Sequence, residues 1–418
     1  MDTLSSATSS DSAAQEAEFS GAEAQQAPAE EAVSSEGSVA AEGYLPDCSS
    51  PEYLRGLLNM VLAVACREKA SDVYLKAGNP PYLRILGQMH PLECDVLTPA
   101  FTEALALDIM PNHMRAGFAH EKPEANFVYA LEELGRFRVN AYRQRDTVAL
   151  VMRRISDEIM DIETLGLPPV LRSLAMNKRG LVLVTGPTGS GKSTTLASMI
   201  RYRKEHAPGH IVTIEDPIEY VHSDAPGCLV SQREVGSDTA CFKDALESAL
   251  RQAPDVLLIG EMRDIASVEA AVYFAETGHL VLSTLHANNA VQTIERVLQF
   301  FPEDMHAPVL QQLSINIRGI VAQRLIPSTD GKRTVAVEVL VGNTRMQENI
   351  REMHLGNIKS ELDSFATEGM QSFDHHLLQL VREGRITPEE AVRHSDNMND
   401  MKLKLRHLRN EITSRGQS

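Results

Sequence analysis

The 418-residue sequence contains no Trp, and aromatic residues make up only 5% of it. Acidic residues outnumber basic ones, 57 against 40, which gives a formal net charge of −17. Proteins that bind nucleic acid need basic patches for the phosphates, and those that stack on bases need aromatic side chains. The composition therefore counts against direct nucleic-acid binding, although it leaves room for a local basic channel.

Cysteine is also scarce, with five in the chain and none in a Cys-x-x-Cys pair. We therefore expect neither a disulfide framework nor a zinc site, and reduced thiols of a cytoplasmic protein are the simplest interpretation. The sequence has no run of about 18 or more apolar residues, so we expect no membrane span. Its first residues lack a positive segment followed by an apolar stretch, so we expect no secretory signal.

Residues 1–50 differ in composition from the rest of the chain. They carry ten acidic residues and no Lys or Arg, and Ala, Ser, Gln and Gly fill most of the remainder. Such a segment buries too little apolar surface to offset the entropy lost on ordering. We predict a disordered acidic tail that solvates the chain, and a partner-binding arm is the alternative.

Residues 51–155 are predicted to form a small α+β domain. Apolar residues at helical spacing indicate an amphipathic helix over 51–69. Short strand-like runs follow, separated by breaks at Pro80-Pro81 and Leu134-Gly135, with a second helix among them. The predicted strands are Ser71–Lys76, Tyr82–Leu86, Asn126–Ala130, Arg136–Gln144 and Val148–Ile155, and the second helix is Pro99–Met110.

From about Arg179 the pattern changes to short apolar runs that alternate with helical stretches. Apolar runs with few polar interruptions are typical of buried parallel strands. We predict a linker over 156–176, an α/β core over 177–344 and a helical region over 345–418. The predicted core strands are Leu181–Thr185, His210–Glu215, Val256–Gly260, Leu280–Thr284 and Thr334–Val341, and the predicted helices are Ser193–Lys204, Phe242–Arg251 and Ile265–Thr277.

The segment Gly186–Ser193 (GPTGSGKS) fits the phosphate-binding pattern G-x-x-x-x-G-K-[ST] in full, between a predicted strand and a predicted helix. Its glycines let backbone N–H groups curl round an anion, and the helix N-terminus adds a favourable dipole. We predict an ATP and Mg²⁺ site in which Lys192 reaches the β- and γ-phosphates and the Ser193 hydroxyl ligates Mg²⁺. The predicted nucleotide-binding residues are Gly186, Pro187, Thr188, Gly189, Ser190, Gly191, Lys192, Ser193, Thr194 and His286.

Two of the predicted core strands end in carboxylates. One runs into Thr213–Glu219, and the other is the apolar segment Asp255–Glu261. The carboxyl ends of strands face the ligand crevice of an open α/β sheet. We predict that Glu261 orients the attacking water and contacts Mg²⁺, and that Glu215 shares in handling water. The alternatives are a salt bridge from Glu261 to Arg263 and a solvated turn after Glu215.

The segment Gly278–Asn288 holds two histidines, one at each end of a predicted strand. His279 and His286 are seven residues apart with no nearby Cys, which makes them a poor metal pair. We assign His279 a structural role. His286, at the carboxyl end of the strand, is predicted to sense the γ-phosphate or to couple to a neighbouring subunit.

The phosphate loop, Thr213–Glu219, Asp255–Glu261 and Gly278–Asn288 follow one another in this order. They resemble the Walker A, Asp box, Walker B and His box of the secretion ATPase superfamily. The combination is highly specific because each motif constrains a different strand end. The resemblance spans about residues 51–400. It implies an α/β fold: a RecA-like P-loop ATPase core, a smaller N-terminal PAS-like α+β domain and C-terminal helices.

Within the superfamily, the sequence resembles the pilus-retraction branch, the PilT/PilU family, in Arg251–Asp255 followed by Gly260–Asp264, and in Ser71–Tyr74. PilT-like chains carry a C-terminal Ala-Ile-Arg-Asn-Leu-Ile-Arg-Glu signature, and Glu348–His354 departs from it. Other stretches look like PilU, so the chain resembles the PilU type. These stretches are Phe274–His279, Gly369–Asp374 and Glu389–Asp396.

The resemblance implies a homo-hexameric ring in which the small domain packs on the core of the neighbouring subunit. Arginines of that domain would then complete the neighbour's ATP site. The candidates are Arg136, Arg138, Arg153 and Arg154, of which we select Arg138 and Arg153. The simpler explanation of arginines that alternate along a strand is a solvated face.

These features lead to the hypothesis of a hexameric, Mg²⁺-dependent ATPase that turns hydrolysis into domain rotation and drives type IV pilus retraction and twitching motility. The resemblance implies two partners, a paralogous PilT-like retraction ATPase and the inner-membrane platform protein of the pilus machine. It also implies a cytoplasmic location at the pilus base, peripheral to the inner membrane. Residues 156–166 are the predicted hinge between the two domains.

Two alternatives stay open. Type II secretion and pilus assembly ATPases share the core, but many carry a four-cysteine zinc module after the Walker B strand. Beyond residue 94 this sequence has only Cys228 and Cys241, both before Glu261, which counts against that class. The other alternative is an accessory subunit that binds ATP and barely hydrolyses it, and the filled catalytic positions count against it. The helices after about residue 345 either contact a partner or only pack on the core.

Overall fold

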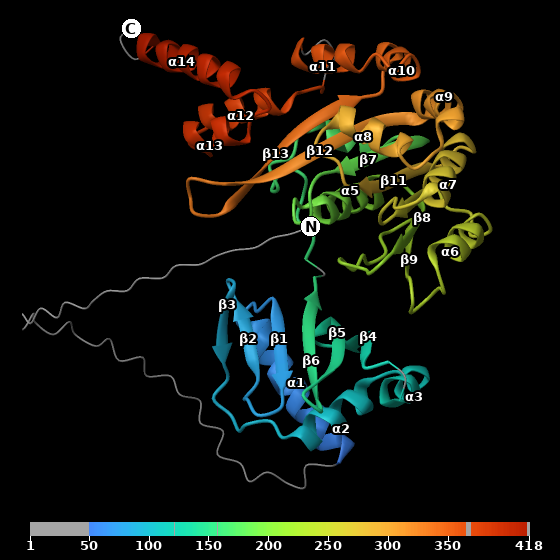
Figure 1. Cartoon of the computed structure of the whole chain (residues 1–418), viewed down its shortest axis with the longest axis vertical. Coiled ribbons are helices and arrows are strands. Elements are labelled where there is room, and N and C mark those ends of the chain that lie inside the picture. The colour runs from blue at the N-terminus through green and yellow to red at the C-terminus, as the bar shows by residue number, and fades with distance from the viewer. Residues whose placement is uncertain (1–49, 121, 157, 365–368, 416–418) are drawn as a thin grey trace, which may run out of the picture. The chain divides into compact units, whose positions relative to one another are not determined.

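The computed structural model describes residues 50–120, 122–156, 158–364 and 369–415 of the chain. Two β-sheets with associated helices make up these residues (Figure 1). The tail predicted over residues 1–50 lies outside the described residues except for Ser50, whose hydroxyl accepts a hydrogen bond from the Tyr53 N–H at the start of the first helix. No helix of the described residues is both long and apolar enough to cross a membrane.

Residues 51–155 build a six-stranded antiparallel sheet with the order β3-β2-β1-β6-β5-β4. Alternate residues of β5, such as Phe137 and Val139, are buried in one core with α1 and α2. This alternation is what a sheet with one covered face requires. The strands and helices predicted here are confirmed to within two residues at each end. The elements are α1 (Pro51–Arg67), β1 (Asp72–Lys76), β2 (Tyr82–Ile85), β3 (Gln88–Pro91), α2 (Pro99–Ile109), α3 (Asn112–His120), β4 (Glu124–Leu131), β5 (Gly135–Gln144) and β6 (Thr147–Ile155).

The second sheet has seven strands in the order β13-β12-β7-β11-β10-β8-β9. Its strands run parallel except β13, which pairs antiparallel with β12 in a long hairpin (Figure 1). The prediction of parallel core strands is thus confirmed for β7, β8, β10 and β11. The strands are β7 (Gly180–Thr185), β8 (Gly209–Glu215), β9 (Cys228–Glu234), β10 (Val256–Ile259), β11 (Leu280–Leu285), β12 (Ile317–Pro327) and β13 (Arg333–Val341).

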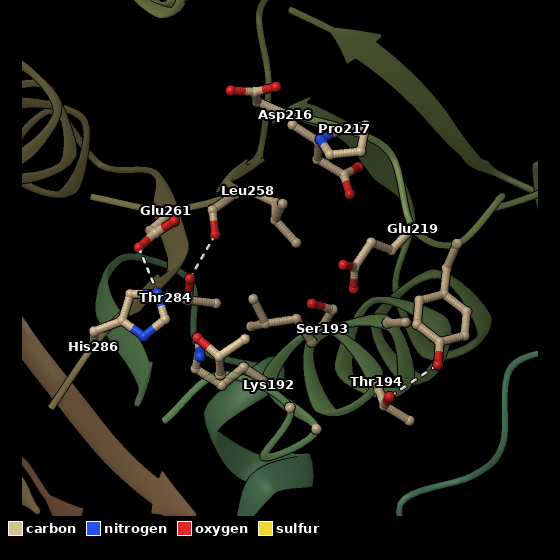
Figure 2. Close-up of a pocket in the computed structure, with 18 of the residues that line it drawn as sticks. Lys192, Ser193, Thr194, Asp216, Pro217, Glu219, Leu258, Glu261, Thr284 and His286 are labelled. Carbon is tan, nitrogen blue, oxygen red and sulfur yellow. Dashed lines mark hydrogen bonds and ion pairs between the residues drawn. The ribbon is translucent and has the colours of Figure 1, made fainter. Parts of the chain in front are cut away.

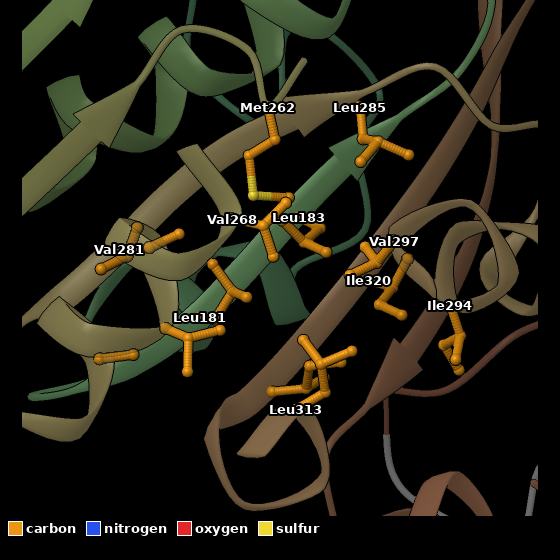
Figure 3. Packing of buried hydrophobic residues seen from close by; sticks show 14 of the residues in the cluster. Leu181, Leu183, Met262, Val268, Val281, Leu285, Ile294, Val297, Leu313 and Ile320 are labelled. Carbon is orange, nitrogen blue, oxygen red and sulfur yellow. The ribbon is translucent and has the colours of Figure 1, made fainter. Parts of the chain in front are cut away.

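Helices cover both faces of the seven-stranded sheet, so its central strands are buried on both sides. In β7, Leu181 and Leu183 pack with α6 to α9 on one face (Figure 3), whereas Val182 and Val184 pack with α4 and α5 on the other. Burying each such side chain stabilises the fold by roughly 1.5–3 kcal/mol. The helices are α4 (Val170–Ala175), α5 (Lys192–His206), α6 (Phe242–Ala249), α7 (Ile265–Glu276), α8 (Ala290–Leu298) and α9 (His306–Asn316), with a short 3₁₀ turn at Glu303–Met305.

The C-terminal helices extend this core. Met346 and Ile350 of α10 and Ile358 and Leu362 of α11 join the same apolar cluster as α7 to α9. The next helices form a separate cluster with β12 and β13, in which Phe373 is fully buried. Their bounds are α10 (Thr344–Arg351), α11 (Leu355–Ser364), α12 (Phe373–Arg382), α13 (Pro388–His394) and α14 (Met398–Arg415).

The segment 156–176, predicted as a linker, contains a helix that the sequence analysis did not predict. Leu171, Leu174 and Ala175 of α4 are buried against the seven-stranded sheet, and Ile162 joins the same cluster. Pro169 forms the N-cap of α4. Proline is well tolerated at this end of a helix because no intrahelical partner awaits its missing N–H.

The sequence analysis also did not predict several other elements. β3 is four residues long and wholly exposed, so no buried apolar residue marks it. β9 lies at the sheet edge and alternates only weakly. The helices α3, α8 and α9 were also missed, although the Asn289 N-cap and the spacing of Ile294, Val297 and Leu298 do signal α8.

Candidate functional site

The carboxyl ends of β7, β8, β10 and β11 meet at one edge of the seven-stranded sheet. The loops that follow these strands enclose a pocket of about 550 Å³ (Figure 2). Adjacent strand ends are tied together, because the Thr284 hydroxyl donates to the Gly260 carbonyl at 2.7 Å. The pocket thus unites four motifs that lie far apart in the sequence.

The phosphate loop wraps the start of α5 with glycines in the left-handed region, at φ +76° for Gly189 and +90° for Gly191. At Gly186 a Cβ would lie 2.5 Å from both the Gln323 carbonyl oxygen and the Ser190 Oγ, so only glycine fits. The loop is therefore packed from behind and leaves its other side open to the pocket. Its lining residues are Thr188, Gly189, Gly191, Lys192, Ser193 and Thr194.

The Lys192 ammonium donates hydrogen bonds to the Gly186 and Pro187 carbonyls, at 3.0 and 3.1 Å. Burial lowers its pKa, and the charges of Glu261 and Glu219 act in the opposite direction. The cation is thus half-desolvated and already held inside the loop. It can exchange these neutral carbonyl partners for phosphate oxygens.

Glu261 follows β10 and contacts two groups at the pocket. Arg263 Nε lies 2.7 Å from its Oε2. His286 Nε2 lies 2.9 Å from its Oε1 (Figure 2). The salt bridge to Arg263 that was the alternative reading of Glu261 is therefore present. It is compatible with a pocket role, since Glu261 also lines the pocket.

Glu215, at the end of β8, lines the pocket but has its carboxylate held by two neighbouring side chains. Its Oε1 accepts hydrogen bonds from Thr213 Oγ1 at 2.7 Å and Gln232 Nε2 at 3.2 Å. Burial raises the pKa of this carboxyl. The neighbouring Glu219 instead points into the pocket toward Ser193 (Figure 2), which makes it a second candidate to handle water or metal.

The two histidines occupy different surroundings. His286 lines the pocket beside Glu261. His279 Nδ1 lies 3.1 Å from the Phe274 carbonyl, and its ring packs edge-on against the Phe274 ring. The structural role predicted for His279 fits these contacts.

Tyr220, His222 and Phe242 also line the pocket, although the sequence analysis did not single them out. The Thr194 hydroxyl and the Tyr220 hydroxyl lie 2.8 Å apart at one wall, with Phe242 nearby in the lining. Burial lowers the pKa of His222 to about 4, so this ring is neutral at physiological pH. No motif marks these three residues: Tyr220 and His222 lie between β8 and β9, and Phe242 begins α6.

Oxygen donors and acidic charge give the pocket its electrostatic character. The Ser193 hydroxyl and the carboxylates beside it are ligands that Mg²⁺ prefers. A triphosphate would add negative charge, so these residues fit ATP together with a divalent cation rather than alone. Among the described residues, the carboxylates of the lining are Glu215, Asp216, Glu219 and Glu261, and its Lys and Arg side chains are Lys192 and Arg263.

The predicted arginines lie on the six-stranded sheet and do not line this pocket. Arg153 faces Asp72 on β1 and Arg138 on β5, and Asp72 also faces Arg84 on β2. Arg153 Nε contacts the buried Asp72 carboxylate at 2.8 Å, whereas Arg84 Nε is 3.9 Å away. We call these four residues the charged row. Arg138 is exposed and makes no ion pair within the described chain.

The parallel sheet, the phosphate loop and the carboxylates at the strand ends define a P-loop ATPase with a RecA-like core and a smaller N-terminal α+β (PAS-like) domain. The family model described as "Type II/IV secretion system protein" matches residues 49–393. The chain belongs to this family and, within it, to the PilT/PilU family of ATPases.

Named relatives agree with this placement. The chain is 46% identical to the type IV pilus ATPase PilU of Pseudomonas aeruginosa over 83% of this chain and 90% of that protein. It is 42% identical to PilT of the same organism, over 79% and 96%. Among solved structures, the pilus retraction motor PilT with bound ADP superposes with a TM-score of 0.76 at 42% identity, covering 81% of this chain and 97% of that one.

Proposed function

We propose that this chain is an ATPase motor that hydrolyses ATP to power type IV pilus retraction. The observation that carries the proposal is the single pocket that joins the phosphate loop to Glu261 and His286. The names of the relatives, pilus ATPases and a pilus retraction motor, support the cellular process. A twitching motility protein of Neisseria gonorrhoeae, 40% identical over 77% of this chain and 86% of that protein, supports it as well.

In the proposed site, the phosphate loop holds the triphosphate with its backbone N–H groups and with Lys192. The Ser193 hydroxyl and carboxylate oxygens of Glu261 or Glu219 would hold Mg²⁺, which neutralises charge on the phosphates when bound. Lys192 would move from the Gly186 and Pro187 carbonyls to phosphate oxygens. Such a move stays within reach of a side chain that starts inside the loop.

Hydrolysis needs a water held in line with the γ-phosphate more than it needs covalent chemistry. We assign that task to Glu261, whose carboxylate is oriented on both sides by Arg263 and His286. His286 lies at the end of β11 and would report the presence of the γ-phosphate through Glu261. Glu215, whose carboxylate accepts hydrogen bonds from Thr213 and Gln232, would share in handling the water.

The charge of the pocket supports a further contribution from outside it. Its carboxylates outnumber its Lys and Arg side chains among the described lining residues, so the transition state would gain from added cations. We propose that Arg138 and Arg153 of a neighbouring copy supply them in a homo-hexameric ring. The same proposal divides the chain into an N-terminal domain over 51–155, a core over 177–344 and a C-terminal region over 345–418, with a hinge near 156–166.

We further propose that the motor works at the cytoplasmic base of the pilus, on the inner-membrane platform protein and alongside a PilT-like paralogue. The similarity to a protein named PilU, together with the match to PilT, supports the paralogue relationship. Relatives named type II secretion proteins are less similar, such as one of Pseudomonas aeruginosa that is 34% identical over 65% of this chain and 57% of that protein.

Steady-state ATP hydrolysis by the purified protein tests the proposal, alone and mixed with a PilT-like paralogue, with and without Mg²⁺. We expect Mg²⁺-dependent turnover that Glu261→Ala abolishes. No turnover alone, with activity or stimulation only in the mixture, would instead favour an accessory subunit. No nucleotide binding in any mixture would overturn the proposal.

A further inference from the structure

One side chain of the described residues forms a hydrogen bond with the phosphate loop on the side that faces away from the pocket. Gln323 lies on β12, the strand next to β7, and is only 1% exposed. Its side-chain amide donates a buried hydrogen bond of 2.7 Å to the Ser190 carbonyl, across 133 positions of sequence. Gln323 does not line the pocket and belongs to none of the sequence motifs.

The orientation of this amide follows from its partner. A backbone carbonyl can only accept, so the NH₂ end of Gln323 must face Ser190. The same residue also touches the loop through its backbone, since a Cβ at Gly186 would meet the Gln323 carbonyl oxygen at 2.5 Å. A Cβ at Gly191 would meet its Nε2 at 3.2 Å. Gln323 thus lies against the loop at Gly186 and at Ser190–Gly191.

A second observation concerns polar atoms buried at the same place. Gln323 Oε1 and Ser190 Oγ have no hydrogen-bond partner in the described chain. Buried polar atoms are nearly always paired in folded proteins, and exceptions call for an explanation. Leaving these polar atoms unpaired costs stability, so the one hydrogen bond from the Gln323 amide to the loop is expected to do more than fill space in the core.

Lys192 also forms hydrogen bonds with the loop, and these differ in one respect from the hydrogen bond of Gln323. Lys192 bonds the Gly186 and Pro187 carbonyls through the group that would contact phosphates. Bound phosphate would therefore compete with the hydrogen bonds of Lys192. The hydrogen bond of Gln323 lies on the side of the loop away from the pocket, so it can persist when the pocket is filled.

We propose that Gln323 is a positioning residue that holds the phosphate loop in its anion-binding shape, both before and after nucleotide binds. It acts through the Ser190 carbonyl, which directs the neighbouring backbone N–H groups toward the pocket. Its effect is on binding, because the loop contacts the phosphates equally in the ground and transition states. The inference rests on the proposed binding of ATP at this loop.

Gln323→Met tests the proposal, since Met keeps the length and apolar stem and removes the donor without adding charge. We expect the Kd for a fluorescent ADP analogue and the KM for ATP to rise about tenfold, with kcat within about threefold of the parent. Gln323→Asn, which keeps an amide that cannot reach Ser190, should behave alike. Either variant suffices if the other does not fold.

Gln371→Met is the matched control. Gln371 donates its amide to the Val337 carbonyl at 3.1 Å on the same sheet, away from the pocket. It should leave the Kd within about twofold, even where thermal unfolding shows a similar loss of stability. Unchanged Kd in a folded Gln323 variant, or equal changes in the Gln371 control, would overturn the inference. If the parent protein itself binds no nucleotide, the proposed function fails instead.

Discussion

The two sheets of this protein place their charged side chains in different ways. In the parallel sheet, the strand interiors are apolar on both faces, and charged groups gather beyond the carboxyl ends around Lys192 and Glu261. In the antiparallel sheet, one face is apolar and the charged row, Arg84, Asp72, Arg153 and Arg138, crosses the strands. The parallel arrangement separates the residues that pack from those of the candidate site.

The antiparallel arrangement does not make this separation. Asp72 is 3% exposed and depends on Arg153 for a charge-assisted hydrogen bond. Arg153 would therefore serve both stability and chemistry, if it also reaches a neighbour's site. The difference predicts that substitutions at the pocket change turnover alone, whereas substitutions in the charged row change stability as well.

Glu261→Gln should have the largest effect. Removing the carboxylate that orients water is expected to lower kcat by about 10²–10⁴-fold while the free energy of unfolding stays within about 1 kcal/mol. ATP turnover and denaturant unfolding measure the two quantities. Glu269→Gln, on the exposed face of α7, is the matched control and should change neither. A Glu261 variant with normal turnover would contradict the assigned role.

Glu338→Gln tests the cost of a buried carboxylate on β13, the antiparallel edge strand of the seven-stranded sheet. Glu338 is 5% exposed and accepts a hydrogen bond from the Ala290 N–H, and burial raises its pKa to about 7. Its contribution to stability is fully present below the unfolded pKa near 4.5 and is lost as pH rises through about 7. Between pH 5 and 8, the parent should lose up to about 3 kcal/mol relative to the Gln variant.

Urea unfolding of both proteins at the two pH values measures this difference. The Gln variant keeps an oxygen acceptor for the helix N-terminus and cannot ionise. Parallel pH profiles for the two proteins would show that Glu338 ionises in the fold as it does in water.

Arg153→Ala and Arg138→Ala distinguish the contribution of the charged row to stability from its contribution to ATP turnover. The first leaves the buried Asp72 carboxylate without its nearest partner and should destabilise the protein by about 1–3 kcal/mol. The second removes an exposed arginine and should cost less than about 0.5 kcal/mol. If both arginines act on a neighbouring subunit's site, both substitutions lower ATP turnover. Mixing either variant with a Glu261→Ala subunit, which keeps its arginines, should then restore turnover. Equal stability losses would contradict this reading of the row.

Arg263→Ala should have the smallest effect. Arg263 is half-exposed and pairs with Glu261 and Asp216, so its loss should cost under about 1 kcal/mol of stability. Turnover should fall by less than about tenfold, because Glu261 keeps its contact to His286. A loss of turnover as large as that of Glu261→Gln would mean that Glu261 acts mainly as the partner of Arg263.

Much of the candidate site could be predicted because its residues follow buried strands. The apolar runs ending at Thr185, Glu215 and Glu261 indicated parallel strands, and parallel strands place their carboxyl ends together. Lys192, Glu261 and His286 do line one pocket. What the sequence did not reveal is which carboxylate is free: Glu215 is held by Thr213 and Gln232, while Glu219 points into the pocket.

The sequence by itself determined the class of site, because a phosphate loop needs its glycines and lysine at fixed spacing along one short segment. It also determined the apolar runs that must be buried as strands. Only the tertiary structure decided the long-range partners of those residues: His286 on Glu261, Gln323 behind the loop and Asp72 beside Arg153. Such contacts depend on strand order and register, which bring together residues as much as 133 positions apart and leave no local pattern to read.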